Sequence, residues 1–365
     1  MKLYQIAVTL AAGVVVGSLR SGWFAGTLQN ATLYVFLPAL IFEAAWQLNL
    51  RLLIKSWRLV ALLAVPGVAV TAAIVAAVMH FAAGMPLEDA MLLGAVLSAT
   101  DPVAIVAIFR RLAVPPLLAT IVEAESLLND AVAVILYRSV VAVSVSGVLS
   151  TQTKTIALWA IASPFVGAAI GAAFGALFAN ALRERVPAVL QGASTFACAY
   201  FAYFLADRAH GSGIFAVVTL AIVMRAMHDT HASLVMVTSV GRAWSVAATV
   251  ANATLFFLIG ASVAVGNLWA HRAVVCFAVA ATLAARAVVV YGLPIFGTRL
   301  KRSWKVVMQA AGIRGALSLA LALGIPATVA TRTAIVDATF AVVLLTMLLG
   351  TLTYERGIGS LDFTT

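Results

Sequence analysis

The sequence predicts an all-α membrane protein that crosses the bilayer about twelve times. Of its 365 residues, 64% are hydrophobic and only 10% are charged, whereas soluble domains carry about 25% charged residues. The apolar residues form continuous blocks of roughly 18 to 28, each long enough to cross a hydrocarbon core of about 30 Å as a helix. Because these blocks do not alternate with polar residues, they favour helices over a β-barrel.

The expected spans follow the apolar blocks in order. They are residues 3–19, 30–48, 59–82, 90–109, 116–147, 156–182, 187–206, 211–227, 233–266, 273–296, 304–325 and 334–353. Most prolines in them, such as Pro66 and Pro164, predict kinks. The fourth and eleventh spans instead carry polar breaks at mid-depth, Thr100-Asp101-Pro102 and Gly312-Ile313-Arg314-Gly315. Two broken helices of opposite orientation, seven spans apart, indicate an inverted-repeat transporter.

The basic residues predict the orientation. With a cytoplasmic N-terminus, fourteen basic residues fall in inner segments and five in outer loops, which is the positive-inside pattern. We therefore expect a multi-pass protein of the cell (inner) membrane with both termini in the cytoplasm. The scatter also accounts for the net charge of +10 without a nucleic-acid partner. The inner residues are Lys2, Arg51, Lys55, Arg58, Arg110, Arg111, Arg183, Arg185, Arg225, Arg299, Lys301, Arg302, Lys305 and Arg356, and the outer ones are Arg20, Lys154, Arg208, Arg272 and Arg332.

One integral membrane domain is expected over residues 1–365, without a soluble regulatory domain, because no segment between spans is long enough to fold alone. The lack of a P-loop pattern disfavours a nucleotide partner and an ATP-driven pump. Cys198 and Cys276 lie far apart in apolar blocks, so neither a disulfide framework nor a cysteine-based transition-metal site is predicted. We expect a gradient-driven transporter with no cofactor beyond its transported ions.

Several ionisable residues lie inside predicted spans, where a charge at the helix centre costs roughly 2.5 to 3.5 kcal/mol. They must face one another, water or an ion, and they mark a candidate functional site. The carboxylates are Glu43, Asp101, Glu123, Glu125 and Asp130, and the arginines are Arg138, Arg242, Arg286 and Arg314.

The fifth span predicts two polar stripes, because residues four apart share a helix face. Ser126 and Asp130 offer the hard oxygen ligands that small cations prefer. Glu125 and Asn129 suit the fork of an arginine, and Arg314 is the natural candidate for that partner.

The other polar residues have plainer interpretations. Glu123 is either part of a cavity mouth or a snorkelling surface residue. Arg138, Arg242 and Arg286 are expected to be pairing, boundary or headgroup residues rather than ligands. His228, Asp229 and His231 resemble metal ligands superficially but are expected in a short cytoplasmic loop.

Four fragments together resemble the monovalent cation/proton antiporter family, which contains bacterial Na+/H+ antiporters and eukaryotic Na+/H+ exchangers. They are L-P-A-L-I-F-E-A-A at 37–45, T-D-P at 100–102, E-A-E-S-L-L-N-D-A at 123–131 and G-I-R-G-A-L-S-L-A-L-A-L at 312–323. The resemblance implies a homodimer in the lipid bilayer, a core and a dimerisation panel, and two crossed discontinuous helices. Residues 8–20 resemble the second of the family's usual thirteen spans, so the first is expected to be missing.

The resemblance also implies roles for single residues. Asp130 would bind a proton or a cation in turn, and Asn129 would be the neutral neighbour found in the electroneutral branch. The cation, Na+ before K+ or Li+, would contact Asp130, the Ser126 hydroxyl and the Thr100 backbone carbonyl, with Glu43 and Asp101 binding directly or through water. Glu125, Arg314 and Asn129 would form a structural group that holds the crossed helices.

The expected function is therefore secondary antiport of a monovalent cation for protons by alternating access. A transporter of another substrate on the same fold and a cation channel are the alternatives, although neither selectivity-filter loops nor symmetric pore helices are evident. An enzyme is disfavoured because no nucleophile triad or H-E-x-x-H pattern lies at membrane depth.

Overall fold

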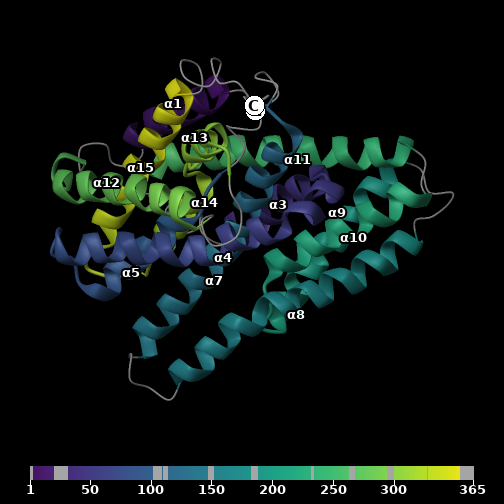
Figure 1. Cartoon of the computed structure of the whole chain (residues 1–365), viewed down its shortest axis with the longest axis horizontal. Helices are drawn as coiled ribbons and strands as arrows, with labels where there is room; N and C mark the ends of the chain where they lie inside the picture. The colour runs from purple at the N-terminus through teal and green to yellow at the C-terminus, as the bar shows by residue number, and fades with distance from the viewer. Residues whose placement is uncertain are drawn as a thin grey trace. The chain divides into compact units, whose positions relative to one another are not determined.

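The computed structural model describes residues 3–19, 32–101, 109, 114–146, 152–181, 188–231, 234–262, 268–293, 300–326 and 328–353. These residues form helices and no strands (Figure 1), which confirms the predicted all-α class. Among them, five helices are long and apolar enough to cross a membrane. These cover Leu50–Phe81, Pro116–Ser144, Lys154–Ala179, Arg272–Gly292 and Arg332–Gly350.

Most helices follow the predicted spans. Helix α4 begins nine residues before the predicted span because its first turns, from Leu50, carry basic residues beyond the continuous apolar block. The helices are α1 (Leu3–Leu19), η1 (Thr32–Phe36), α3 (Leu37–Gln47), α4 (Leu50–Phe81), α5 (Leu87–Ser98), α7 (Pro116–Ser146), α8 (Gln152–Ala181), α9 (Ala188–Arg208), α10 (Gly213–His231), α11 (Leu234–Ser262), α12 (Arg272–Ala287), η3 (Val288–Gly292), α13 (Arg302–Ala310), α14 (Ala316–Leu323) and α15 (Arg332–Thr353).

The prolines have different effects at different positions. Helices α4 and α8 continue through Pro66 and Pro164, as expected where neighbouring groups in a membrane protein satisfy the freed backbone. Pro38 lies in the first turn of α3, where the missing N–H has no intrahelical partner to lose.

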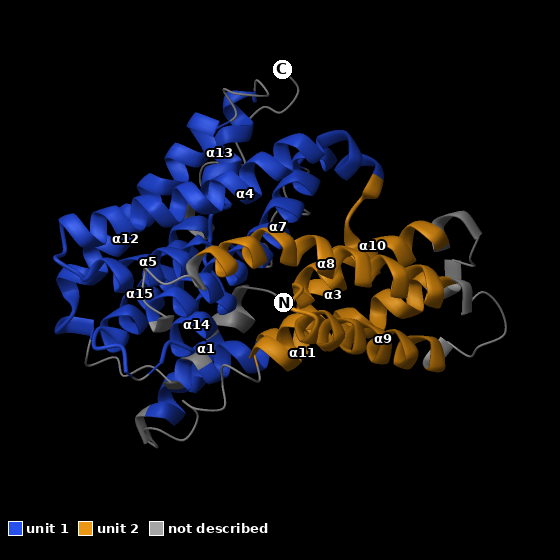
Figure 2. Cartoon of the chain, turned by 90° about the horizontal axis from the view of Figure 1, so that it is seen from below, with its two compact units in different colours: residues 1–29, 51–144, 253–365 blue, residues 30–50, 145–252 orange. Residues whose placement is uncertain are grey.

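The chain divides into two compact units (Figure 2). The first contains Met1–Gln29, Arg51–Ser144 and Ala253–Thr365, and the second contains Asn30–Leu50 and Val145–Asn252. Within the first unit, α15 packs against α12, α14 and α5, and α14 also packs against α5. This packing brings the two predicted helix breaks into one unit.

The second unit is held by close packing between α8 and α10. Gly167 and Gly171 of α8 lie against the backbone of Ser212 and Ala216, so a Cβ at either glycine would overlap a carbonyl oxygen. Glycines spaced by four residues allow membrane helices to approach closely. Helix α10 also packs against α3 and α9.

Candidate functional site

The two predicted breaks are present and touch each other within the first unit. Helix α5 ends at Ser98, and the backbone at Ala99 is extended, with φ −65° and ψ 142°. The second break separates α13 from α14 at residues 311–315. The Asp101 N–H donates a hydrogen bond to the Ile313 carbonyl at 2.9 Å. The break residue Pro102 lies outside the described residues.

Gly315 allows this close approach of the two breaks. A Cβ at position 315 would overlap the carboxylate of Asp101. Ser318, one turn further into α14, lies with its hydroxyl 3.5 Å from the Ala99 carbonyl. The backbone of Ala99 and Asp101 therefore finds partners in the second break and in α14 rather than in its own helix.

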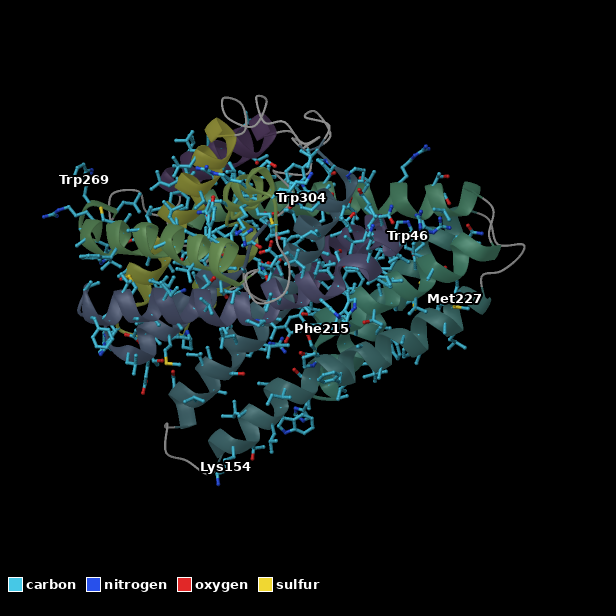
Figure 3. The ribbon with its side chains drawn as sticks, viewed as in Figure 1. Trp46, Lys154, Phe215, Met227, Trp269 and Trp304 are labelled. Carbon is cyan, nitrogen blue, oxygen red and sulfur yellow. The ribbon has the colours of Figure 1, made fainter. Side chains whose placement is uncertain are left out.

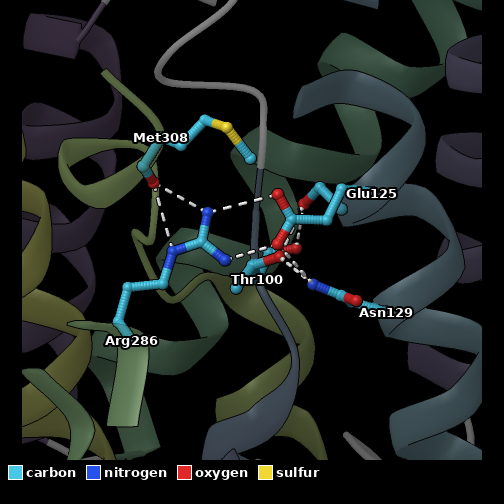
Figure 4. Close-up of polar contacts among 6 residues, drawn as sticks. Thr100, Glu125, Asn129, Arg286 and Met308 are labelled. Atoms are coloured by element: carbon cyan, nitrogen blue, oxygen red, sulfur yellow. Dashed lines mark hydrogen bonds and ion pairs between the residues drawn. The ribbon is translucent and has the colours of Figure 1, made fainter. Parts of the chain in front are cut away.

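A buried polar cluster joins the first break to α7 (Figure 4). The hydroxyls of Thr100 and Ser126 lie 3.0 Å apart, and Ser126 also donates to the Thr100 carbonyl. Asn129 donates to the Thr100 hydroxyl at 3.1 Å and to Glu125 at 3.4 Å. All four residues are buried, and the side chains of Ser126 and Asn129 face the first break.

Arg286 of α12, rather than Arg314, forms the ion pair with Glu125 (Figure 4). Its second terminal nitrogen lies 3.2 Å from Glu125 Oε2. Arg286 also donates twice to the Met308 carbonyl, at 3.1 and 2.7 Å. Met308 lies in the last turn of α13, where carbonyls have no intrahelical donor. Arg286 thus donates to the Glu125 carboxylate and to the Met308 carbonyl at the same time. This second partner explains why Arg286, and not the expected Arg314, pairs with Glu125.

Arg314 lies in the second break and is only 1% exposed. Its N–H donates to the Thr346 hydroxyl at 3.1 Å. Its Nε and Nη1 atoms have no hydrogen-bond partner among the described residues, but its charge interacts with those of Glu125 and Asp130. Arg314 therefore contributes positive charge to the site without forming a direct ion pair with any described residue.

Asp130 lies on α7 next to Asn129 and one turn after Ser126. Its carboxylate interacts with the Thr100 backbone amide and with the charges of Asp101 and Arg314. The Asp130 Oδ1 and Asn129 Oδ1 atoms are buried and have no hydrogen-bond partner among the described residues. Buried acceptors without donors are costly. These two oxygens are therefore available to water or to a cation.

The described contacts do not place the remaining predicted residues in this polar cluster. Glu43 belongs to the second unit, where it accepts a hydrogen bond from Gln47, so its role as a cation ligand stays a prediction. Glu123 is half-buried on α7. The predicted loop around His228 is wrong, since α10 continues to His231. No cluster of His, Cys, Asp and Glu able to hold a metal occurs in the described ranges.

Sequence reasoning missed the specific role of Arg286. An arginine within an apolar span was recognised as a pairing residue, but its partner depends on how α12 is rotated against α7. That rotation leaves no local pattern in the sequence. The role of the Met308 carbonyl was also missed, because every residue has a backbone carbonyl and the sequence does not mark the one that accepts from Arg286.

The profile of the family described as "Sodium/hydrogen exchanger, transmembrane" matches residues 1–356. The chain belongs to this family. Exchangers are transporters rather than enzymes, and the protein is integral to a membrane. The family resemblance inferred from the four sequence fragments is thereby confirmed.

Named relatives support the same grouping. The low-affinity Na(+)/H(+) antiporter NhaS1 of Synechocystis is 33% identical over 345 residues, covering 90% of this chain and 64% of the relative. The Na(+)/H(+) antiporter ApNhaP of Aphanothece halophytica is 31% identical, with the same two coverages. The chain thus spans just under two thirds of the length of these two relatives.

The fold of the chain also matches a solved structure. The sodium proton antiporter MjNhaP1 of Methanocaldococcus jannaschii superimposes with a TM-score of 0.80 at 18% identity. The match covers 95% of this chain and 92% of the other. At this identity the likeness shows the fold alone.

Proposed function

We propose that this chain exchanges a monovalent cation, Na+ in the first place, for protons across the membrane. The observation that carries the proposal is the buried cluster of Thr100, Ser126 and Asn129, next to Asp130, where the two breaks meet. Carbonyl, hydroxyl and carboxylate oxygens are the ligands of hard cations. Family membership and the names of the relatives support the same activity.

Asp130 is the proposed exchanging group, with Ser126 and Thr100 as neighbouring ligands and Asp101 close by. Proton and cation compete for the same carboxylate, and this competition couples their transport. Either one neutralises Asp130 and so lowers the cost of moving the site past an apolar barrier. The empty, charged form is disfavoured during that movement.

The charges around Asp130 support electroneutral exchange. Arg286 and Arg314 balance Glu125 and Asp101, while Asn129 carries no charge. One negative charge then remains on Asp130. A single Na+ or a single proton neutralises it, so we expect one proton to be exchanged per cation.

Alternating access is proposed to move a core bundle against a dimerisation panel. We assign the third to fifth and tenth to twelfth spans to the core, and the first unit contains them, which supports this division. We also propose that the broken helices cross, that the protein is a homodimer in the inner membrane with cytoplasmic termini, and that one integral domain over 1–365 needs no cofactor.

The test replaces Asp130 by Asn, which removes the titrating charge with little change in volume. Purified wild-type protein in liposomes should dissipate an imposed pH gradient when Na+ is added, whereas Asp130→Asn should not. Li+ and K+ added in parallel determine the cation preference. The matched control is Glu88→Gln, since Glu88 is an exposed carboxylate in the first turn of α5.

Two outcomes would contradict the proposal. The first is exchange at the wild-type rate by a folded Asp130→Asn protein. The second is a Na+ current far above the turnover of a carrier, which would favour the channel alternative. Clamping the membrane potential tests electroneutrality separately, because the rate of one-for-one exchange should not depend on voltage.

A further inference from the structure

A cavity lies in the first unit, apart from the polar cluster around Asp130. It has a volume of about 610 Å³ and is lined by the N-terminal part of α4, the start of α7 and the start of α13. Its α4 wall is residues 54–59, with Leu117 and Ile121 on α7 and Leu300, Lys301 and Trp304 at the start of α13. None of the residues lining the Asp130 cluster lines this cavity.

Three basic side chains give the cavity a positive charge. Lys55 and Arg58 come from α4, and Lys301 precedes α13. All three are exposed, and none of the described residues that line the cavity is acidic. Positive side chains converging from two elements favour an anion over a cation or a neutral ligand.

Aromatic and apolar groups surround these charges. Trp57 is 57% exposed and Ile54 is 73% exposed, and the Arg58 guanidinium lies 5.7 Å from the Trp57 ring centre. Trp304 of α13, labelled in Figure 3, carries a buried indole N–H without an acceptor among the described residues. Tryptophan beside lysine and arginine is typical of the level of lipid headgroups.

We propose that this cavity binds the headgroup of an anionic phospholipid from the membrane leaflet that it faces. The phosphodiester would contact Lys55, Arg58 and Lys301, and the acyl chains would lie along apolar side chains such as Ile54. A soluble anion would use the charges but not the exposed apolar groups beside them. The basic residues on this side predict that the leaflet is cytoplasmic. The inference does not depend on which ion is transported.

The test compares lipid binding by two triple variants of the full chain. Lys55→Gln/Arg58→Gln/Lys301→Gln removes the charges of the cavity, and Lys154→Gln/Arg208→Gln/Arg272→Gln removes three exposed charges elsewhere. Binding of phosphatidylglycerol is measured by native mass spectrometry and by the rise in unfolding temperature, with phosphatidylcholine as the neutral probe. The cavity variant should bind phosphatidylglycerol roughly 100-fold more weakly, because each of the three lost basic contacts lowers the affinity about five-fold.

The control variant should bind like the wild type. Equal binding by all three proteins, or equal loss in both variants, would overturn the proposal. So would displacement of the lipid by millimolar inorganic phosphate, which would indicate a site for a free anion. If the cavity variant fails to fold, Lys55→Gln and Lys301→Gln are measured singly, each with an expected loss of about five-fold.

Discussion

The ion pair between Glu125 and Arg286 gives the sharpest prediction, because the sequence favoured a different arginine. Replacing Arg286 with Met leaves the carboxylate of Glu125 buried without its partner, at 1% exposure. Breaking a buried pair in this way costs about 3 to 5 kcal/mol. The Met308 carbonyl also loses both of its Arg286 donors.

A double-mutant cycle separates these contributions. In Glu125→Gln/Arg286→Met the unpaired charge is gone, and only the Met308 carbonyl remains without donors, at about 1 to 3 kcal/mol. The double variant should therefore be more stable than the sum of the single effects predicts, with a coupling energy of about 2 to 3 kcal/mol. Reversible unfolding in mixed micelles measures the free energies under one fixed detergent composition.

The matched cycle uses Arg314→Met with Glu125→Gln. Arg314 interacts with Glu125 only through its charge, so this coupling should be clearly smaller. Strong coupling to Arg314 together with none to Arg286 would refute the pairing described above. It would restore the partner that the sequence pattern favoured.

Three further predictions concern the breaks and the cation ligands. Gly315→Ala should cost about 1 to 3 kcal/mol of stability and reduce exchange, because its Cβ would overlap Asp101. Gly292→Ala, with nothing within 4 Å of the added Cβ, is the neutral control, and equal unfolding temperatures would contradict the reasoning. Ser126→Ala should raise the apparent KM for Na+ by roughly five-fold, because the loss of the hydroxyl contact costs about 1 kcal/mol. The maximal rate should change little. An unchanged KM would show that Ser126 is not a cation ligand. The exchange rate should fall as pH falls, because protons then exclude Na+ from Asp130. A ten-fold rise in the Na+ concentration should move the acidic side of the pH profile about one pH unit lower. A pH profile that does not depend on the Na+ concentration would argue against competition at one carboxylate.

Much of this fold was predictable because its information is local. The apolar blocks define most helices, and the T-D-P and G-I-R-G fragments mark the two breaks. The four-residue spacing of Ser126 and Asp130, and of Glu125 and Asn129, places their side chains on neighbouring stripes of α7. The contacts of Ser126 and Asn129 with Thr100 agree with this spacing.

The choice between the two arginines was not predictable in the same way. Arg286 and Arg314 both lie inside predicted spans, and both are cations that could pair with Glu125. Their difference arises from long-range packing, since the Met308 carbonyl offers Arg286 a second partner at the end of α13. The end of α10 was misplaced because its polar last turn, through His231, looks like a loop by hydropathy alone.

The hydrogen bond from Asp101 to Ile313 joins the two breaks through main-chain atoms only. Most side-chain substitutions at these two positions leave both atoms in place, so mutational scanning will underestimate how much the junction matters. Asp101→Pro removes the donor itself, and a one-residue deletion within residues 311–315 shifts the acceptor. Changes in backbone chemistry or chain length, rather than alanine replacements, are the perturbations to which this contact is sensitive.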